Sequence, residues 1–134
     1  MDIALTIVDL KKKQLQYAGA YNPLFLYRNG ELIEYKADRM PIGIYIKEKP
    51  EFTNNVVDLQ KGDTFYLFSD GFQDQFGGEK GDKYKVKRLK KTLAEIQNKS
   101  MAEQKEILEK TFDGWKGNYQ QLDDVILIGV RINQ

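Results

Sequence analysis

Residues 63–71 read Asp-Thr-Phe-Tyr-Leu-Phe-Ser-Asp-Gly, an apolar strand pattern that stops on an aspartate followed by a glycine. Residues 121–130 read Gln-Leu-Asp-Asp-Val-Ile-Leu-Ile-Gly-Val, in which paired aspartates precede a second strand pattern. Carboxylates at strand ends lie at the rim of a sheet, where they reach solvent and a metal ion without the cost of a buried charge. The two stretches therefore predict an acidic site at a sheet rim.

The relative direction of these two strands decides whether the carboxylates meet. Antiparallel neighbours would place the end of one strand and the start of the other at the same sheet edge. The long helical connection between them also permits a parallel crossover, which would place them at opposite ends. In the antiparallel case four carboxylates converge on a candidate hard-cation site, namely Asp70, Asp74, Asp123 and Asp124. The alternative is that the aspartates are ordinary turn residues.

Strand patterns fill most of the remaining chain, and two helical patterns precede the last strand. The Asn-Gly pair at 29–30 is a strong hairpin signal. Apolar residues have helical spacing from Val86 to Ile96 and again after Ser100, which opens a capping-box pattern. The expected strands are 3–9, 14–18, 24–28, 31–35, 52–59, 64–68 and 125–132, with a glycine loop at 77–82. This order predicts an α+β fold with a largely antiparallel sheet or sandwich and a helical pair inserted before the last strand.

Composition restricts the chemistry open to the chain. Its 134 residues fit one domain, and 41% hydrophobic with 31% charged residues is typical of a globular protein. The chain has no cysteine and no histidine, which excludes thiol nucleophiles, imidazole bases and thiolate zinc sites. Any metal site must therefore use oxygen ligands, which suit magnesium, manganese or calcium.

Charge and hydropathy favour neither nucleic acid nor membrane as a partner. The 21 basic residues nearly balance the 20 acidic ones. We interpret the basic run from Lys80 to Lys91 as the solvated face of an amphipathic helix, since Tyr84 is the only aromatic residue within it. No apolar stretch approaches the roughly 20 residues of a membrane span, and no signal peptide is visible. We expect no nucleic-acid partner and no direct membrane contact.

Four short blocks occur in an order that is similar to a known family. They are Tyr-Ala-Gly-Ala-Tyr-Asn-Pro-Leu at 17–24, Met-Pro-Ile-Gly at 40–43, the block 62–71 that ends on Asp70-Gly71, and Asp123-Asp124 with its β-branched run. Together they resemble the C-terminal part of the catalytic domain of SpoIIE-like serine/threonine phosphatases, within the metal-dependent protein phosphatase 2C superfamily. The resemblance implies a partial phosphatase 2C-like fold over one domain, residues 1–134.

The resemblance also implies an activity and a set of site residues. The activity is dephosphorylation of phosphoserine or phosphothreonine on a regulatory protein, by water activated at a centre of two magnesium or manganese ions. Asp70 and Asp123 match metal ligands of the family. Asp124 is implied as a ligand or as a residue that supports the ligands, and Asp74 as an acidic residue near the site.

One family motif is missing. The family carries an earlier Asp-Gly-x-Gly loop with a metal-bridging aspartate, whereas no Asp-Gly pair precedes Asp70 in this chain. We therefore interpret the chain as the C-terminal portion of a larger phosphatase domain, or as a reduced version of one, and expect little activity from it alone. The alternative is a non-catalytic interaction module that binds a regulatory partner.

The resemblance implies further partners. These are a phosphoprotein substrate such as an anti-anti-sigma-like protein, and upstream sensor or regulatory domains in a cytoplasmic signalling protein. We also expect a homodimer, because the strand Ile3 to Asp9 would lack both a neighbour along one edge and a cover over its apolar face.

Overall fold

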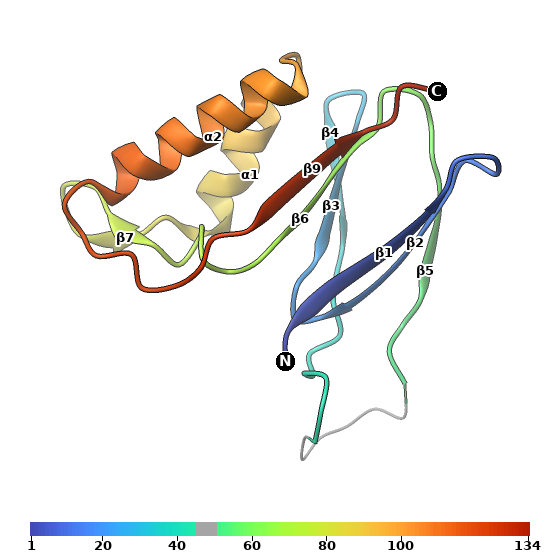
Figure 1. Ribbon diagram of the computed structural model, residues 1–134, viewed down its shortest axis with the longest axis horizontal. Coiled ribbons are helices and arrows are strands. Elements are labelled where there is room, and N and C mark those ends of the chain that lie inside the picture. The colour runs from blue at the N-terminus through green and yellow to red at the C-terminus, as the bar shows by residue number, and fades with distance from the viewer. Residues whose placement is uncertain (45–50) are drawn as a thin grey trace. The chain divides into compact units, whose positions relative to one another are not determined.

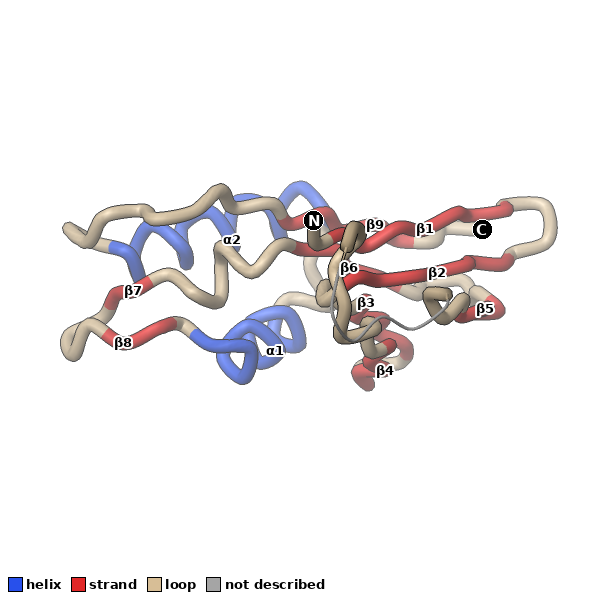
Figure 2. The backbone as a smooth tube through the Cα atoms, turned by 90° about the horizontal axis from the view of Figure 1, so that it is seen from below, coloured by secondary structure: helices blue, strands red, loops and turns tan. Residues whose placement is uncertain are grey.

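The computed structural model describes residues 1–44 and 51–134, which form two compact units. Residues 1–68 and 128–134 form the first, here called the sheet unit, and residues 69–127 form the second, here called the helical unit. Figure 1 shows the elements in chain order, and Figure 2 separates the helices of the helical unit from the long strands by colour. Each unit has its own buried side chains.

The first sheet of the sheet unit is antiparallel, with the strand order β1-β2-β5 (Figure 1). Its strands are β1 Ile3–Asp9, β2 Gln14–Ala20 and β5 Asn55–Asp58. Because β2 lies in the middle, β1 is an edge strand. Side chains alternate along it, so Thr6 and Val8 are partly buried whereas Leu5 and Ile7 are exposed on the outer face.

The second sheet has the order β4-β3-β6-β9. Its strands are β3 Leu24–Arg28, β4 Glu31–Tyr35, β6 Thr64–Phe68 and β9 Leu127–Arg131. The Asn29-Gly30 hairpin is confirmed, and both residues have positive φ, 51° and 79°, as a primed turn requires. The Ile132 N–H donates to the Asp63 carbonyl and the Ser69 N–H to the Ile126 carbonyl, so β9 runs antiparallel to β6.

The hydrophobic core of the sheet unit lies between its two sheets. Its buried cluster consists of Leu15, Tyr17, Leu24, Leu26, Val57, Leu59, Phe65 and Ile132. These residues alternate with others along their strands, as the period of two predicts. On the opposite face of the second sheet, Phe25 contacts Phe68 edge-on with ring centroids 4.8 Å apart. Both faces of this sheet are therefore apolar at β3 and β6.

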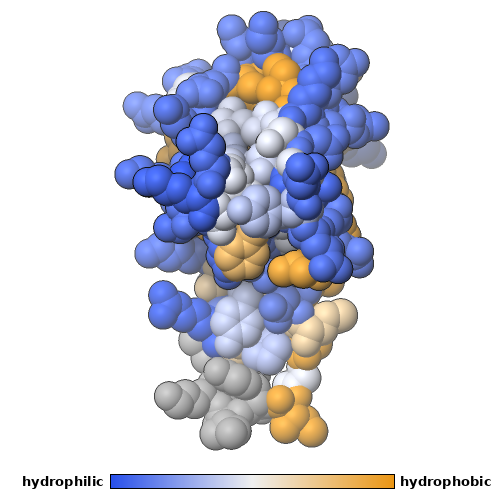
Figure 3. All heavy atoms as spheres, turned by 90° about the vertical axis from the view of Figure 1, so that its left-hand side faces the viewer, coloured by the Kyte–Doolittle hydropathy of each residue, from blue (hydrophilic) through white to orange (hydrophobic). Residues whose placement is uncertain are grey.

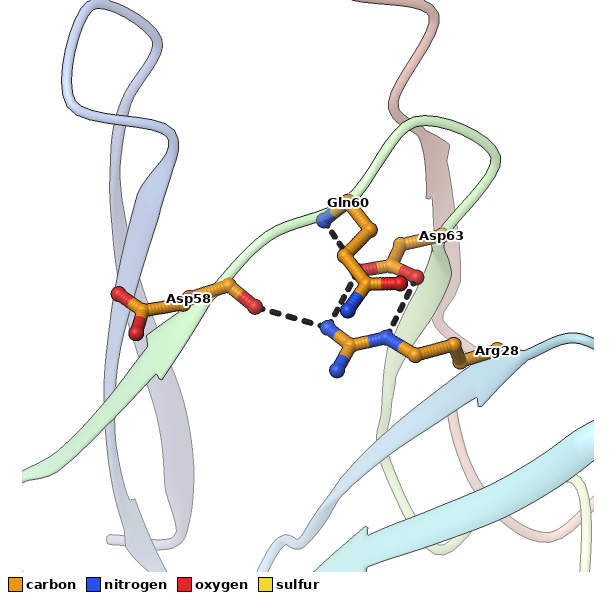
Figure 4. A network of polar contacts seen from close by, with 4 residues as sticks. All are labelled: Arg28, Asp58, Gln60 and Asp63. Carbon is orange, nitrogen blue, oxygen red and sulfur yellow. Dashed lines mark hydrogen bonds and ion pairs between the residues drawn. The ribbon is translucent and has the colours of Figure 1, made fainter.

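A partly buried ion pair joins the turns at one end of the sheet unit (Figure 4). Arg28 donates from Nε to Asp63 Oδ1 at 2.9 Å and from Nη2 to Asp63 Oδ2 at 2.7 Å. The same nitrogen, Nη2, donates to the Asp58 carbonyl at 2.7 Å, and the Gln60 N–H donates to Asp63 Oδ2 at 2.8 Å. The Asp63 side chain is only 1% exposed, so these bonds satisfy a carboxylate that water cannot reach.

The helical unit contains a helix pair and a short hairpin. Its elements are β7 Phe76–Gly77, β8 Asp82–Lys83, α1 Lys85–Glu95 and α2 Met101–Lys116. The predicted capping box is confirmed, since Ser100 Oγ accepts from the Glu103 N–H at 3.2 Å. In the described part of the chain, neither helix is long and apolar enough to cross a membrane. Figure 3 shows a face on which hydrophilic side chains predominate.

Four predicted elements have other boundaries in the structure. The glycine loop predicted at 77–82 is shorter, because Gly77 and Asp82 pair in the β7–β8 hairpin and residues 78–81 form its turn. The Trp115 carbonyl of α2 accepts a bond from the Gly78 N–H at 2.9 Å, and Trp115 packs on Gly77 and Gly78. The strands predicted at 52–59 and 125–132 are shorter. The second of these begins at Leu127, since Asp124 and Ile126 bond to Ser69. β2 extends two residues further than predicted, to Ala20.

Candidate metal centre

The candidate site lies where the segment after β6 meets the segment before β9, within the helical unit. Ser69 joins the two segments through three hydrogen bonds. Its N–H donates to the Ile126 carbonyl at 3.0 Å, and its Oγ accepts from the Ile126 N–H at 3.2 Å and donates to the Asp124 carbonyl at 3.3 Å. These bonds hold Asp70 beside residues 123 and 124.

Gly71 permits the close approach of the two backbones. A Cβ at this position would lie 2.1 Å from the Asp124 carbonyl oxygen, far inside van der Waals contact. The obstructing atom belongs to the backbone and cannot rotate away. The glycine that follows Asp70 is therefore required by packing at the site.

The Asp70 and Asp123 carboxyls are in contact. Partial burial is the largest cause that raises the pKa of Asp70 above its ordinary value, followed by the negative charges of Asp74 and Asp123. A side-chain hydrogen bond with Asp123 raises it further. The structure thus brings Asp70 and Asp123 together at the ends of antiparallel strands, rather than at opposite ends as a parallel crossover would.

Asp74 and Asp124 take different positions around this pair. The Asp74 N–H donates to the Asp70 carbonyl at 2.9 Å, so the chain turns back after Asp70, and the Asp74 carboxylate lies 3.7 Å from the ammonium of Lys83. The Asp124 N–H donates to Asp123 Oδ1 at 2.8 Å, which orients the Asp123 carboxyl. Asp124 therefore contributes to the site through its backbone, and Asp74 through its charge.

The arrangement offers oxygen donors of the kind that hard cations bind. Carboxylate oxygens are the ligands that magnesium and manganese prefer, and two like charges in contact favour a bound cation. Across residues 1–44 and 51–134, however, no group of three or more acidic side chains is placed to hold a metal ion. The donor chemistry fits one hard cation held by the Asp70–Asp123 pair together with ligands from elsewhere.

Sequence reasoning missed the residues that position the acidic pair. Ser69 directly precedes the Asp-Gly motif, and a hydroxyl at this position was the feature of the sequence that could have indicated its role. Phe72, just after the motif, contacts Tyr84 and Phe112 edge-on, each with ring centroids 5.2 Å apart, and so fixes the Asp70 loop to the helix pair. Its role depends on contacts with distant residues, which the sequence pattern does not show.

Comparisons with known proteins identify the family of the chain. The sequence profile of the family described as Stage II sporulation protein E (SpoIIE) matches residues 1–133. Among solved structures, the SiaA-PP2C domain of Pseudomonas aeruginosa is similar, with a TM-score of 0.88 and 34% identity. That match covers 98% of this chain and 51% of the other, so the chain spans about half the length of that domain. No match was found among curated protein sequences.

More distant structures share the fold. The PP2C phosphatase domain of SpoIIE from Bacillus subtilis, solved with a fragment of its regulatory domain, matches with a TM-score of 0.74 and 21% identity, over 98% of this chain and 37% of that one. The serine/threonine phosphatase PstP/Ppp of Mycobacterium tuberculosis matches with a TM-score of 0.60 and 18% identity, over 98% and 60%. These matches confirm the predicted α+β, phosphatase 2C-like fold.

Proposed function

The chain belongs to the SpoIIE family of phosphatase 2C-type domains, and we propose that it supplies part of a metal centre for protein dephosphorylation. The substrate is phosphoserine or phosphothreonine on a regulatory protein, and the nucleophile is water. The observation that carries this proposal is the set of hydrogen bonds from Ser69 to Asp124 and Ile126, which holds Asp70 beside Asp123. Two carboxylates held together at a sheet rim are suited to bind a divalent cation.

Each residue of the site has a defined task in this proposal. Asp70 and Asp123 hold magnesium or manganese, and the Asp124 N–H orients Asp123. Ser69 keeps the two segments together, and Asp74 adds negative charge that favours the cation. When bound, the metal lowers the pKa of water and neutralises phosphoryl charge, so that no histidine or cysteine is needed.

We propose that residues 1–134 form a single domain that is the C-terminal portion of a larger phosphatase domain. The absence of an Asp-Gly-x-Gly loop and the 51% coverage of the SiaA domain both support this division. The two-metal centre and turnover then require the missing ligands. The parent is proposed to be a cytoplasmic signalling protein with upstream sensor or regulatory domains and an anti-anti-sigma-like phosphoprotein substrate.

Calorimetric titration of the purified chain with manganese tests the site. We expect weak binding that Asp70→Asn reduces by more than tenfold, since even a residue that only supports a ligand costs about that factor. Asp113→Asn, at an exposed aspartate of α2, is the matched control and should leave the affinity unchanged. Equal affinity of the Asp70→Asn variant and the unaltered chain would refute the assignment.

A phosphatase assay tests whether the chain holds only part of the metal centre. Hydrolysis of p-nitrophenyl phosphate with manganese should stay at the background rate, because two carboxylates seldom hold such a metal without further ligands. Metal-dependent turnover that Asp70→Asn abolishes would show instead that the chain has a complete site.

A non-catalytic interaction module is the second candidate. It is supported by the missing loop and by the absence of a three-carboxylate group among the described residues. Its distinguishing property is binding of an unphosphorylated regulatory protein that needs no metal. Such binding should survive both chelation and Asp70→Asn, whereas binding of a phosphorylated substrate through the metal should not.

A further inference from the structure

Positive charge is concentrated in residues 80–91, here called the basic segment. The segment holds seven basic residues and one acidic residue, a net charge of +6, so the other 122 residues carry a net charge of −5. The formal net charge of +1 therefore hides a strong separation of charge along the chain. The segment includes β8 and the first seven residues of α1. Six of its basic residues are exposed, namely Lys80, Lys83, Lys85, Lys87, Arg88 and Lys91.

The charges of α1 oppose the helix that carries them. Its first turn contains Lys85, Lys87 and Arg88, although the positive end of the helix dipole lies there and favours acidic residues. Lys87 and Lys91 are one turn apart on the same face, where like charges repel each other. The ion pair between Lys91 and Glu95, at 4.0 Å, offsets only one of these charges.

α2 shows the arrangement of charge that favours helix stability. Glu103 lies in its first turn and Lys116 in its last, in agreement with the helix dipole. Lys105 and Glu109 form an ion pair one turn apart, at 3.9 Å. The two helices of one unit thus distribute charge in opposite ways. Because residue choices that lower local stability are expected mainly where they serve a function, α1 presents a candidate binding surface.

The basic segment begins beside the candidate metal site. The Lys83 ammonium lies 3.7 Å from the Asp74 carboxylate, and the Asp74 N–H donates to the Asp70 carbonyl at 2.9 Å. The Lys85 N–H donates to the Gln73 carbonyl at 2.7 Å, which fixes the start of α1 to the same loop. The 11 residues of α1 extend over about 16 Å. An extended peptide spans this length with about five residues.

The chemistry of the segment favours a protein partner over a nucleic acid. Single-stranded nucleic acids are bound by basic grooves with aromatic rings on which bases stack. The aromatic residue of the segment, Tyr84, is only 6% exposed, and its ring packs against Phe72 and Trp115. The exposed part of the segment therefore offers charge and hydrogen-bond donors, which suit carboxylates.

We propose that the basic segment binds acidic residues of the phosphoprotein substrate, at positions within about five residues of the phosphorylated one. This inference rests on the proposed function, in which the phosphoryl group lies at the Asp70–Asp123 pair. The lysines attract an acidic chain and orient it along α1. Recognition of such a partner accounts for charges that lower the stability of the helix.

Fluorescence anisotropy with labelled phosphoserine peptides in magnesium tests the proposal. One peptide has glutamates on both sides of the phosphoserine, and the other has glutamines. The chain should bind the glutamate peptide about tenfold more tightly, the effect that a few exposed ion pairs supply together. Lys87→Glu should remove most of this preference. Lys105→Glu makes the same change of charge at an exposed residue of α2 and is the matched control, which should keep the preference.

The stability of Lys87→Glu separates binding from folding. An acidic residue in the first turn agrees with the helix dipole and pairs with Lys91 one turn later. The variant should therefore unfold at a higher urea concentration than the unaltered chain, so unfolding could not explain its lost preference. A lower urea midpoint would overturn the inference, because its premise is that Lys87 opposes α1.

Equal affinity of the unaltered chain for the two peptides would overturn the proposal, and so would an equal loss of preference in Lys105→Glu. Tighter binding of a single-stranded RNA with the charge of the glutamate peptide would overturn it in favour of a nucleic acid. Asp70→Asn should weaken the binding of both peptides and keep the preference between them. If the proposed function fails, both affinities stay unchanged in Asp70→Asn, whereas failure of this inference abolishes the preference in the unaltered chain.

Discussion

Two aspartates flank strand β6, and their surroundings are opposite. Asp63, just before the strand, is 1% exposed and is held by both Nε and Nη2 of Arg28. Asp70, two residues past the strand, is more exposed; partial burial and next the charges of Asp74 and Asp123 raise its pKa. The aspartate before the strand is therefore paired with an arginine, whereas the aspartate after it is repelled by other carboxylates.

This difference separates a structural carboxylate from a candidate ligand. A carboxylate that is paired within the fold needs no external ion, so its removal lowers the stability of the fold. Carboxylates that the fold holds together against their mutual repulsion gain from a bound cation, and their removal is felt as lost binding.

Asp63→Ala should have the largest effect, a loss of about 3 kcal/mol in the free energy of unfolding, because the bonds from Arg28 and from the Gln60 N–H are lost. Urea denaturation measures the loss. Asp58→Ala keeps the backbone carbonyl that accepts from Arg28 and should change stability by less than about 0.5 kcal/mol. Similar losses in both variants would mean that the ion pair does not stabilise the turn.

Gly71→Ala should have the second largest effect, because its Cβ pushes Asp124 away. We expect the free energy of unfolding to fall by about 1–3 kcal/mol and manganese binding to be lost. Gly114→Ala is the matched control. Its Cβ would meet nothing within 4 Å and it lies within α2, so the variant should gain about 0.5–1 kcal/mol. Retained metal binding in Gly71→Ala would contradict the close approach at the site.

Ser69→Ala should cost about 1 kcal/mol and weaken manganese binding, since the hydroxyl bonds to both Asp124 and Ile126. Ser100→Ala removes another hydroxyl, the cap of α2, at a similar cost of about 1 kcal/mol. Titration of both variants with manganese separates a role at the site from a role in stability alone. Metal affinity should fall only in Ser69→Ala, and an equal fall in both would point to general loosening.

The smallest expected effect on stability at neutral pH comes from replacement of Tyr27. Burial, and next the neighbouring Tyr66, raise its pKa from 10.0 to about 12. The folded state thus favours the neutral phenol, a contribution that is present below about pH 10 and is lost as the pH rises toward about 12. Tyrosinate absorbance during alkaline titration should show a late-ionising group that Tyr27→Phe removes. If the variant's titration matches that of the unaltered chain, Tyr27 ionises as an ordinary tyrosine.

Local patterns explain what could be predicted of the fold. Alternating apolar residues located the strands, the Asn29-Gly30 pair located a hairpin, and Ser100 located the start of α2. Each signal acts over a few residues, so it can be read without knowledge of distant contacts. The hairpin β7–β8 was missed because it depends on Trp115, which lies more than thirty residues away in the chain.

The sequence by itself determined the chemistry open to this protein, because a chain without histidine and cysteine can bind metals only through oxygen. It also placed aspartates at strand ends, where a site could form. Only the tertiary structure decided which of them meet. Asp63 and Asp70 look alike in the sequence, yet one is neutralised by Arg28 and the other joins Asp123, since charge is balanced by neighbours in space.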